Sequence, residues 1–152
     1  MKLIYAIYFF LLTFIGLTQL ACKTPNPAIL NPAAAALEGK WRMVSVKDNS
    51  TNIVTAKPST ITGNVDITFA LFSSAAGIMS GVTPTNSLNG NYSTGGNGAL
   101  SIPAVSATKI IETTWGQLFL DNITWSHDFI FNADGRLHIN ASTNKTLIFV
   151  RQ

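Results

Sequence analysis

The chain has 152 residues, of which 47% are hydrophobic and 11% charged, and its formal net charge is +3. This length suits one domain with a sizeable core, the apolar content excludes a mainly disordered chain, and so small a charge argues against a nucleic-acid-binding surface. The single cysteine excludes an internal disulfide framework and a cysteine-based zinc site.

Residues 1–21 have the pattern of a bacterial export signal, in which a basic residue precedes an apolar run from Leu3 to Leu17. Ala21 stands directly before Cys22, and this arrangement resembles the processing site of bacterial lipoproteins. In that class the cysteine receives a diacylglycerol and becomes the first residue of the mature chain. Gln19 departs from the leucine that the class prefers there. We expect lipidation at Cys22; an ordinary cleaved signal or an uncleaved anchor helix is the alternative.

Residues 22–36 are rich in proline and alanine and predict a tether between the membrane and a folded domain. Three prolines at positions 25, 27 and 32 exclude a regular element over that stretch. The alanines at 33–36, followed by Leu37 and Glu38, suit a short helical turn. The expected location is therefore the bacterial cell envelope, lipid-anchored, at the outer membrane facing the periplasm.

Residues 37–152 carry the pattern of a β-rich domain. The clearest strand is at 65–71, where Val65, Ile67, Phe69 and Leu71 alternate with smaller or more polar residues. Residues 83–91 are expected as a loop, and Gly95 to Gly98 predict a hairpin turn. The strands expected in this half of the domain lie at 39–46, 65–71, 78–79, 90–93 and 99–102.

A change of period predicts one helix at 109–122. Its apolar face has the spacing i, i+4, i+7, i+8 and consists of Ile111, Trp115, Leu118 and Phe119. Thr108 is the expected N-cap. Gly116 inside the helix costs about 1 kcal/mol, so the helix must depend on packing for its stability.

Three short strands are expected to close the chain, at 125–131, 136–140 and 146–151. Asp134-Gly135 predicts the first turn between them and Asn144-Lys145 the second. The predicted fold is mainly β, an antiparallel meander or barrel-like sheet of about seven or eight strands with one helix near 109–122. A barrel or strongly curled sheet leaves few open edges.

Two motifs point to a family. Gly39 and Trp41 belong to a Leu-x-Gly-x-Trp segment at 37–41, and Asn86, Gly90 and Tyr92 belong to an Asn-x3-Gly-x-Tyr segment. Their order and spacing, with the later helix and final hairpin, resemble the META domain family, also called HslJ-like, over residues 37–152. The resemblance implies a small β-barrel-like fold, common in envelope lipoproteins and linked to envelope stress, motility or secretion, without common catalytic residues.

This chain departs from the family's pattern in its cysteines. Thr85 stands where the family has the cysteine of a Cys-Asn step, and the cysteine common after the Thr-Lys or Thr-Arg step is absent. No cysteine-linked feature of the family therefore applies here.

A second resemblance gives a different function. Gly39-Lys40-Trp41 also looks like the Gly-x-Trp that opens lipocalin-type barrels, in which the tryptophan plugs the barrel floor and the interior holds an apolar ligand. The two hypotheses are thus a non-enzymatic envelope protein that acts by contact and a carrier of a small apolar ligand. Large residues at expected inward positions favour a filled interior, so a small ligand is not expected. They are Trp41, Phe69, Phe119 and Phe149.

The sequence offers little that resembles a catalytic or metal site. His127 and Asp128 are neighbours in one expected strand, so their side chains should point to opposite faces and should not pair. His138 is expected on a polar strand face. The two histidines are therefore interpreted as solvated, without a metal, and no catalytic serine motif is present. We expect no enzyme activity and no cofactor.

Several aromatic and amide residues are expected to have structural roles. Six aromatic residues are expected in the core: Trp41, Trp115, Trp125, Phe69, Phe119 and Phe149. Asn86, Asn89 and Asn91 are expected to shape a turn around Gly90, because asparagine tolerates positive φ and bonds its own backbone.

Overall fold

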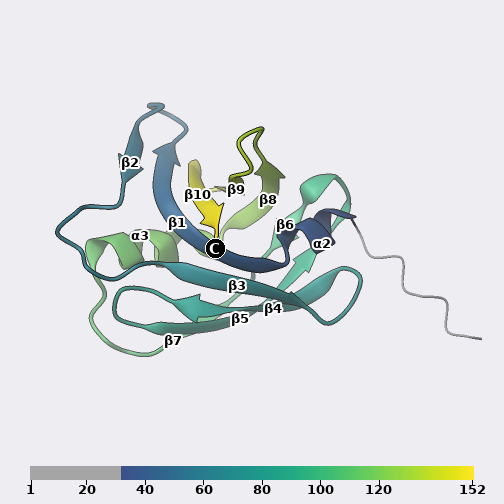
Figure 1. The fold of residues 1–152 in the computed structure, drawn as a ribbon, viewed down its shortest axis with the longest axis horizontal. Helices are drawn as coiled ribbons and strands as arrows, with labels where there is room; N and C mark the ends of the chain where they lie inside the picture. Colours follow the sequence, from purple (N-terminus) through teal and green to yellow (C-terminus); the bar gives the residue numbers. More distant parts are fainter. Residues whose placement is uncertain (1–31) are drawn as a thin grey trace, which may run out of the picture.

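The computed structural model describes residues 32–152, so the predicted signal sequence, Cys22 and most of the tether lie outside the described residues. Antiparallel strands dominate this range (Figure 1). The elements are α2 (Pro32–Leu37), β1 (Gly39–Asp48), β2 (Val54–Ala56), β3 (Asp66–Leu71), β4 (Ala76–Val82), β5 (Ser87–Thr94), the 3-10 turn η1 (Gly96–Gly98), β6 (Leu100–Ser101), β7 (Val105–Ala107), α3 (Thr114–Ile123), β8 (Ser126–Phe131), β9 (Leu137–Ala141) and β10 (Lys145–Arg151).

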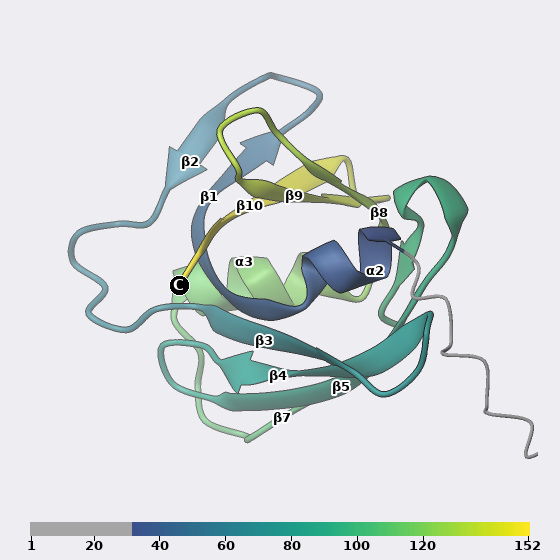
Figure 2. The same cartoon turned by 45° about the vertical axis from the view of Figure 1, so that its right-hand side comes forward.

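The strands form one sheet in the order β6-β5-β4-β3-β1-β10-β9-β8, with β2 paired to β1 and β7 to β5. The sheet curls until its two ends approach, and a single antiparallel bridge between Ala99 and Asp128 joins them. Figure 2 shows the resulting ring of strands. The predicted fold class, an antiparallel barrel-like sheet with one late helix, is confirmed.

A β-bulge explains the mixed alternation of β1. Its register against β10 shifts between Met43 and Ser45, so one extra residue enters β1. Trp41 and Met43 precede the shift and Val46 follows it, and all three are buried. The bulge changes the parity of the strand, which lets residues of odd and even number face the same core.

The interior of the ring is filled by side chains. α2 and α3 lie between the two halves of the curled sheet (Figure 2), and their buried residues belong to one core with those of the strands. Of the six aromatic residues expected in this core, five are at most 1% exposed. Trp125 is the exception, because it lies in the turn before β8 and is 59% exposed.

Helix α3 is present but begins later than predicted. Its N-cap is Thr113, not Thr108, and the hydroxyl of Thr113 accepts a hydrogen bond from the Gly116 N–H at 3.2 Å. Ile111, expected on the buried face, is 93% exposed, whereas Trp115 and Phe119 are buried. No helix in the described range is long and apolar enough to cross a membrane.

The first half of the domain has more strand than predicted. The segment 83–91, expected as a loop, already contains the start of β5 at Ser87. The short strands β2 and β7 were not predicted, and β4 is longer than the pair 78–79. The hairpin turns expected at Gly95–Gly98, Asp134-Gly135 and Asn144-Lys145 are confirmed.

Candidate functional site

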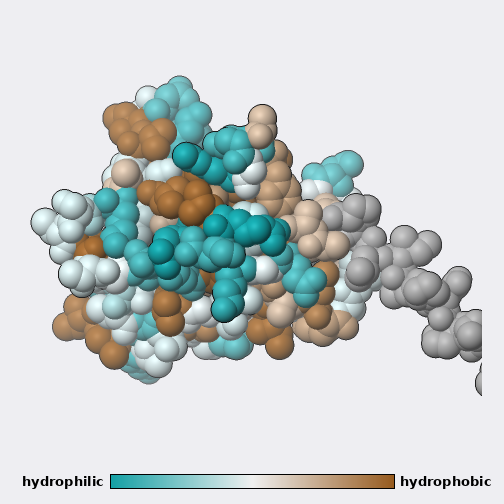
Figure 3. All heavy atoms as spheres, viewed as in Figure 1, coloured by the Kyte–Doolittle hydropathy of each residue, from teal (hydrophilic) through white to brown (hydrophobic). Residues whose placement is uncertain are grey.

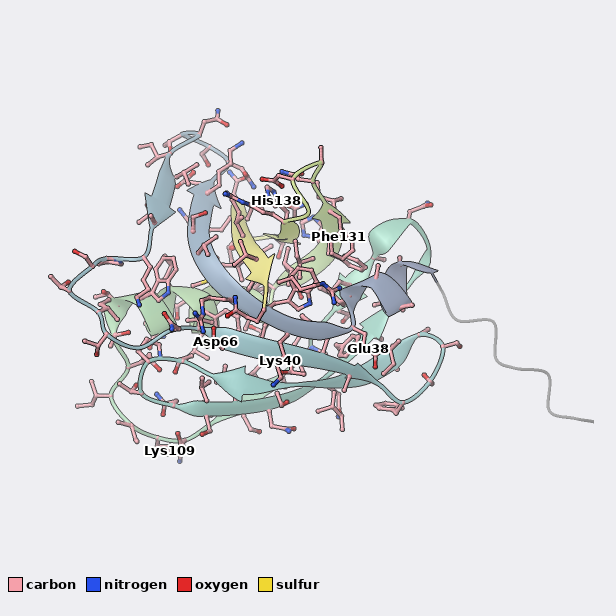
Figure 4. The ribbon with its side chains drawn as sticks, viewed as in Figure 1. Glu38, Lys40, Asp66, Lys109, Phe131 and His138 are labelled. Carbon is pink, nitrogen blue, oxygen red and sulfur yellow. The ribbon has the colours of Figure 1, made fainter. Side chains whose placement is uncertain are left out.

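A polar cleft of about 650 Å³ lies on the outer face of β1, β10, β9 and β8. Its volume falls in the range of ligand sites, about 300–1,000 Å³. Both histidines of the chain line it, together with four asparagines. In Figure 4, His138 lies near the top of the view, and Lys109 lies at the bottom. In the view of Figure 3, apolar residues form separate groups among polar ones. The asparagines are Asn49, Asn132, Asn140 and Asn144.

Strand register explains why the cleft is polar. Lys47, Thr146, Asn140 and Asp128 are paired in one row across the four strands. The adjacent row is buried core and consists of Val46, Leu147, Ile139 and Phe129. Because successive residues of a strand point to opposite faces, the polar row must lie on the outer face.

Hydrogen bonds connect the polar row from side to side. Asn49 Nδ2 donates to Thr146 Oγ1 at 3.0 Å, and Thr146 Oγ1 donates to Asn140 Oδ1 at 2.7 Å. Asn140 Nδ2 donates to Asp128 Oδ1 at 2.5 Å. The other carboxylate oxygen of Asp128 lies 3.1 Å from His127 Nε2. Five side chains, from the turn after β1 and from β10, β9 and β8, are thus held in fixed positions, and all of them except Asp128 line the cleft.

The contact between His127 and Asp128 corrects the expectation that these neighbours could not pair. The register of β8 against β9 shifts between Ser126 and Asp128, so His127 occupies a bulge. A bulge breaks the alternation of side chains between the two faces. The imidazole therefore reaches the carboxylate of the next residue in the chain.

His138 belongs to the neighbouring strand β9 and makes a separate contact. Asn132 Nδ2 lies 3.0 Å from His138 Nε2. Burial lowers the pKa of His138 below its ordinary value of 6.5; Asp134 raises this pKa, and Arg136 and Lys47 lower it. The ring is therefore neutral at neutral pH, and its Nε2 accepts the hydrogen bond from Asn132.

At one end of the cleft, the turn after β1 and the turn before β10 are joined by an ion pair and a backbone hydrogen bond. Lys145 Nζ lies 2.5 Å from Asp48 Oδ2, and the Asn49 N–H donates to the Asn144 carbonyl at 3.0 Å. The hydrogen bond from Lys145, with those from the Thr51 and Ser50 N–H groups, lowers the pKa of Asp48 to about 2. These contacts fix the positions of Asn49 and Asn144.

The residues of the first family motif lie away from the cleft, at the junction of α2 and β1. Trp41 is buried, its Nε1 donates to the Leu37 carbonyl at 2.8 Å, and the guanidinium of Arg151 lies 4.5 Å from its ring centroid. Gly39 has φ +125°, and a Cβ there would lie 2.8 Å from the Arg151 guanidinium. This part of the motif thus joins the first strand to the last.

Asn86, the first residue of the second motif, connects the segment before β5 with the segment before α3. Its Oδ1 accepts from the Ile110 N–H and from Thr108 Oγ1, both at 2.9 Å. Its Nδ2 donates to the Glu112 carboxylate at 2.8 Å. The expected role of Asn86 in a turn around Gly90 is therefore wrong. Asn86 is buried, and its side chain hydrogen-bonds the segment before β5 to the segment before α3. In the described range the asparagines with positive φ are Asn52, Asn97 and Asn144.

Gly90 and Tyr92 of the same motif are also structural. A Cβ on Gly90 would lie 2.6 Å from the Ala104 carbonyl oxygen, so glycine allows the chain before β7 to approach β5. Tyr92 is buried and packs edge to face against Phe69 at 5.0 Å between ring centroids. Burial raises the pKa of Tyr92 to about 12. Neither residue lines the polar cleft.

The cleft was missed at the sequence level because its residues come from distant segments. Bonded pairs such as Asn49 and Thr146 are 97 residues apart. The available signal was the series of amide and imidazole side chains after residue 126, of which the two histidines were interpreted as solvated. In the described range no group of three or more His, Cys, Asp or Glu side chains is placed to hold a metal ion.

Comparisons with known proteins give a likeness of fold. No family model matches the sequence, and no curated protein matches it significantly. Among solved structures, the chain is similar to a protein from Burkholderia xenovorans determined by NMR, with 20% identity and a TM-score of 0.61. The match covers 86% of this chain and 97% of the other. At this identity it supports the barrel-like fold and carries no information about activity.

Proposed function

We propose that this chain is a non-enzymatic, lipid-anchored protein of the bacterial cell envelope, similar to the META domain family, that acts by contacting other envelope components. Its anchor is Cys22, and the polar cleft is its contacting surface. The observation that carries this proposal is the contrast between a filled interior and a pre-organised outer cleft. Interactions with other molecules must then take place outside the barrel.

The packing of the core supports contact rather than transport. Trp41, Trp115, Phe69, Phe119 and Phe149 are each at most 1% exposed and belong to a single buried cluster. An eight-stranded barrel has room either for such side chains or for one small ligand. A carrier would need this volume to be free.

The anchoring part of the proposal is tested by metabolic labelling. Cells that express the full chain or its Cys22→Ala variant are grown with labelled palmitate. We expect label in the wild-type protein and none in the variant, because the variant lacks the thiol that is acylated. Equal labelling of the two proteins would contradict a lipid anchor at Cys22.

The contacting part is tested by crosslinking in intact cells and capture from solubilised envelopes. Asn132→Ala removes an exposed amide of the cleft, and Asn91→Ala removes an exposed amide of β5 as a matched control. We expect the first variant to lose envelope components that the second retains. Retention of every component by both variants would argue against the cleft as the contacting surface.

The carrier is the competing function, because Trp41 belongs to the Gly-x-Trp segment that resembles lipocalin-type barrels and is buried, with the Arg151 guanidinium over its ring. A fluorescent fatty-acid probe separates the two functions. We expect no saturable binding to the full chain. Binding at low micromolar affinity, with displacement by a native lipid, would replace the contact hypothesis with the carrier.

A further inference from the structure

The asparagines that line the cleft keep hydrogen-bonding groups that the protein does not use. A carboxamide has two N–H donors and a carbonyl acceptor. Asn49 and Asn140 each donate one N–H to a side chain of the row, and Asn132 donates one to His138. Asn144 Nδ2 donates to Ser50 Oγ. Each of the four side chains thus has a second N–H to offer, and the side-chain oxygens Oδ1 of Asn132 and Asn144 accept no hydrogen bond from the described residues.

These unused groups are held in place before any ligand arrives. The row is hydrogen-bonded from Asn49 to Asp128, and His127 Nε2 lies 3.1 Å from the Asp128 carboxylate. Side-chain contacts hold both ends of the cleft, Asn132 with His138 at one end and Lys145 with Asp48 at the other. A binding site whose side chains are already ordered loses less conformational entropy when a ligand binds. The unused donors and acceptors can therefore contribute to affinity.

The charge and polarity of the cleft narrow the class of ligand. No acidic residue is among the described residues that line it, and Lys47 supplies its single permanent charge. Ile130 is the one large apolar residue in the lining. Protein interfaces depend on buried aromatic and arginine anchors, which the cleft lacks. The lining instead suits a ligand that both donates and accepts hydrogen bonds over its whole surface.

We propose that the polar cleft binds an oligosaccharide whose sugar rings carry hydroxyl and acetamido groups. A hydroxyl donates and accepts at once, and an acetamido group presents an N–H and a carbonyl to the matching atoms of a carboxamide. Ile130 provides a small apolar contact for the acetamido methyl group. This inference rests on the proposed function in that it takes the cleft as the surface that meets envelope components.

The experiment uses the purified full chain in detergent and two trisaccharides. Chitotriose carries three acetamido groups, and cellotriose has hydroxyls in their place on the same backbone. Binding is measured by calorimetry and by proton NMR of the imidazole rings. The chain has two histidines and both line the cleft, so their ring resonances report on it directly.

We expect chitotriose to bind more tightly than cellotriose and to shift the His127 and His138 resonances. Asn132→Ala should weaken chitotriose binding by about three- to tenfold, the effect of one lost hydrogen bond. Asn91→Ala, on β5, should leave binding unchanged.

Three outcomes would overturn the inference: no binding of chitotriose, equal binding of the two sugars, or binding that Asn132→Ala leaves unchanged. The proposed function is judged separately by the capture experiment. If neither sugar binds and capture of a protein still depends on Asn132, the oligosaccharide is rejected and the contact function stands. If sugar binding is found and capture is independent of the cleft, the contact function fails instead.

Discussion

The Glu112 carboxylate accepts hydrogen bonds from several residues, and no pattern in the sequence around it predicts them. Asn86 Nδ2 and the Thr113 N–H each donate to it at 2.8 Å, and Thr83 Oγ1 also donates. Burial raises the pKa of Glu112, but these hydrogen bonds outweigh burial and the pKa lies below its ordinary value of 4.5. The charged form of the Glu112 carboxylate therefore stabilises the folded state.

Glu112→Gln is expected to destabilise the protein by about 1–3 kcal/mol at neutral pH, because an amide NH2 would face groups that donate. The folded-state pKa is lowered, so the stability due to Glu112 is complete above pH 4.5 and is lost as the pH falls through the folded-state value. Urea unfolding of wild type and variant across this range measures the difference, which should shrink in acid.

Glu38→Gln is the matched control for this prediction, since Glu38 is exposed and its carboxylate accepts no hydrogen bond in the described structure. It should change the free energy of unfolding by less than about 0.5 kcal/mol. A stability difference between Glu112→Gln and wild type that stays constant down to acid pH would show that the carboxylate charge is irrelevant.

At the scale of the elements, bulges and contacts with neighbouring segments decide which way side chains point and where a helix begins. The bulge at His127 pairs that residue with Asp128, against the simple alternation of a strand. Helix α3 begins later in the chain than predicted because the side-chain amide of Asn86 hydrogen-bonds the backbone N–H and carbonyl of Ile110. These bonds keep the residues before Thr113 out of the helix. In both cases a local pattern is overridden by a neighbouring part of the fold.

Two glycines of nearly equal conformation provide a test of the closure between β6 and β8. Gly98 has φ +78° and Gly135 has φ +76°. A Cβ on Gly98 would lie 2.5 Å from the Phe129 carbonyl oxygen across the seam, whereas one on Gly135 would meet nothing within 4 Å. Gly135→Ala should lower the free energy of unfolding by about 1 kcal/mol, because an alanine at this positive φ is strained even without a clash.

Gly98→Ala should cost about 1–3 kcal/mol more than Gly135→Ala, because the added methyl group also pushes the ends of the sheet apart. Thermal or urea unfolding of the two variants measures the difference. Equal destabilisation would mean that the bridge between Ala99 and Asp128 does not hold the seam closed.

At the scale of the whole molecule, the pairing of β1 with both β3 and β10 encloses the core. The last strand lies beside the first, and Arg151 completes the contact by donating to the Ala36 and Glu38 carbonyls. The helices α2 and α3 then fill the space between the halves of the sheet (Figure 2). Stability therefore depends on large side chains in the interior.

Trp115→Ala should destabilise the domain by about 3–5 kcal/mol, the usual effect of losing a large aromatic side chain from a core. Trp115 is 1% exposed, whereas Trp125 is 59% exposed and gives a matched control. Trp125→Ala should change stability by less than about 0.5 kcal/mol. Urea unfolding of both variants checks the prediction, and similar effects at the two positions would contradict this account of the core.

Local patterns were sufficient for the strands at 65–71, 136–140 and 146–151, for the three hairpin turns and for the existence of α3. Alternation, turn residues and helical spacing are properties of residues close together in the chain, so they can be read without knowing the fold. The same patterns placed Trp41, Trp115, Phe69, Phe119 and Phe149 in the core.

The tertiary structure alone decided the place of β1 in the sheet, the two bulges, the start of α3 and the polar cleft. Each depends on contacts between distant residues, such as Asn49 with Thr146 or Asn86 with Ile110. The free energy of such contacts depends on strand register and sheet order, which residues near one another in sequence do not specify. For this reason the asparagines could be recognised individually in the sequence, but their assembly into one cleft could not.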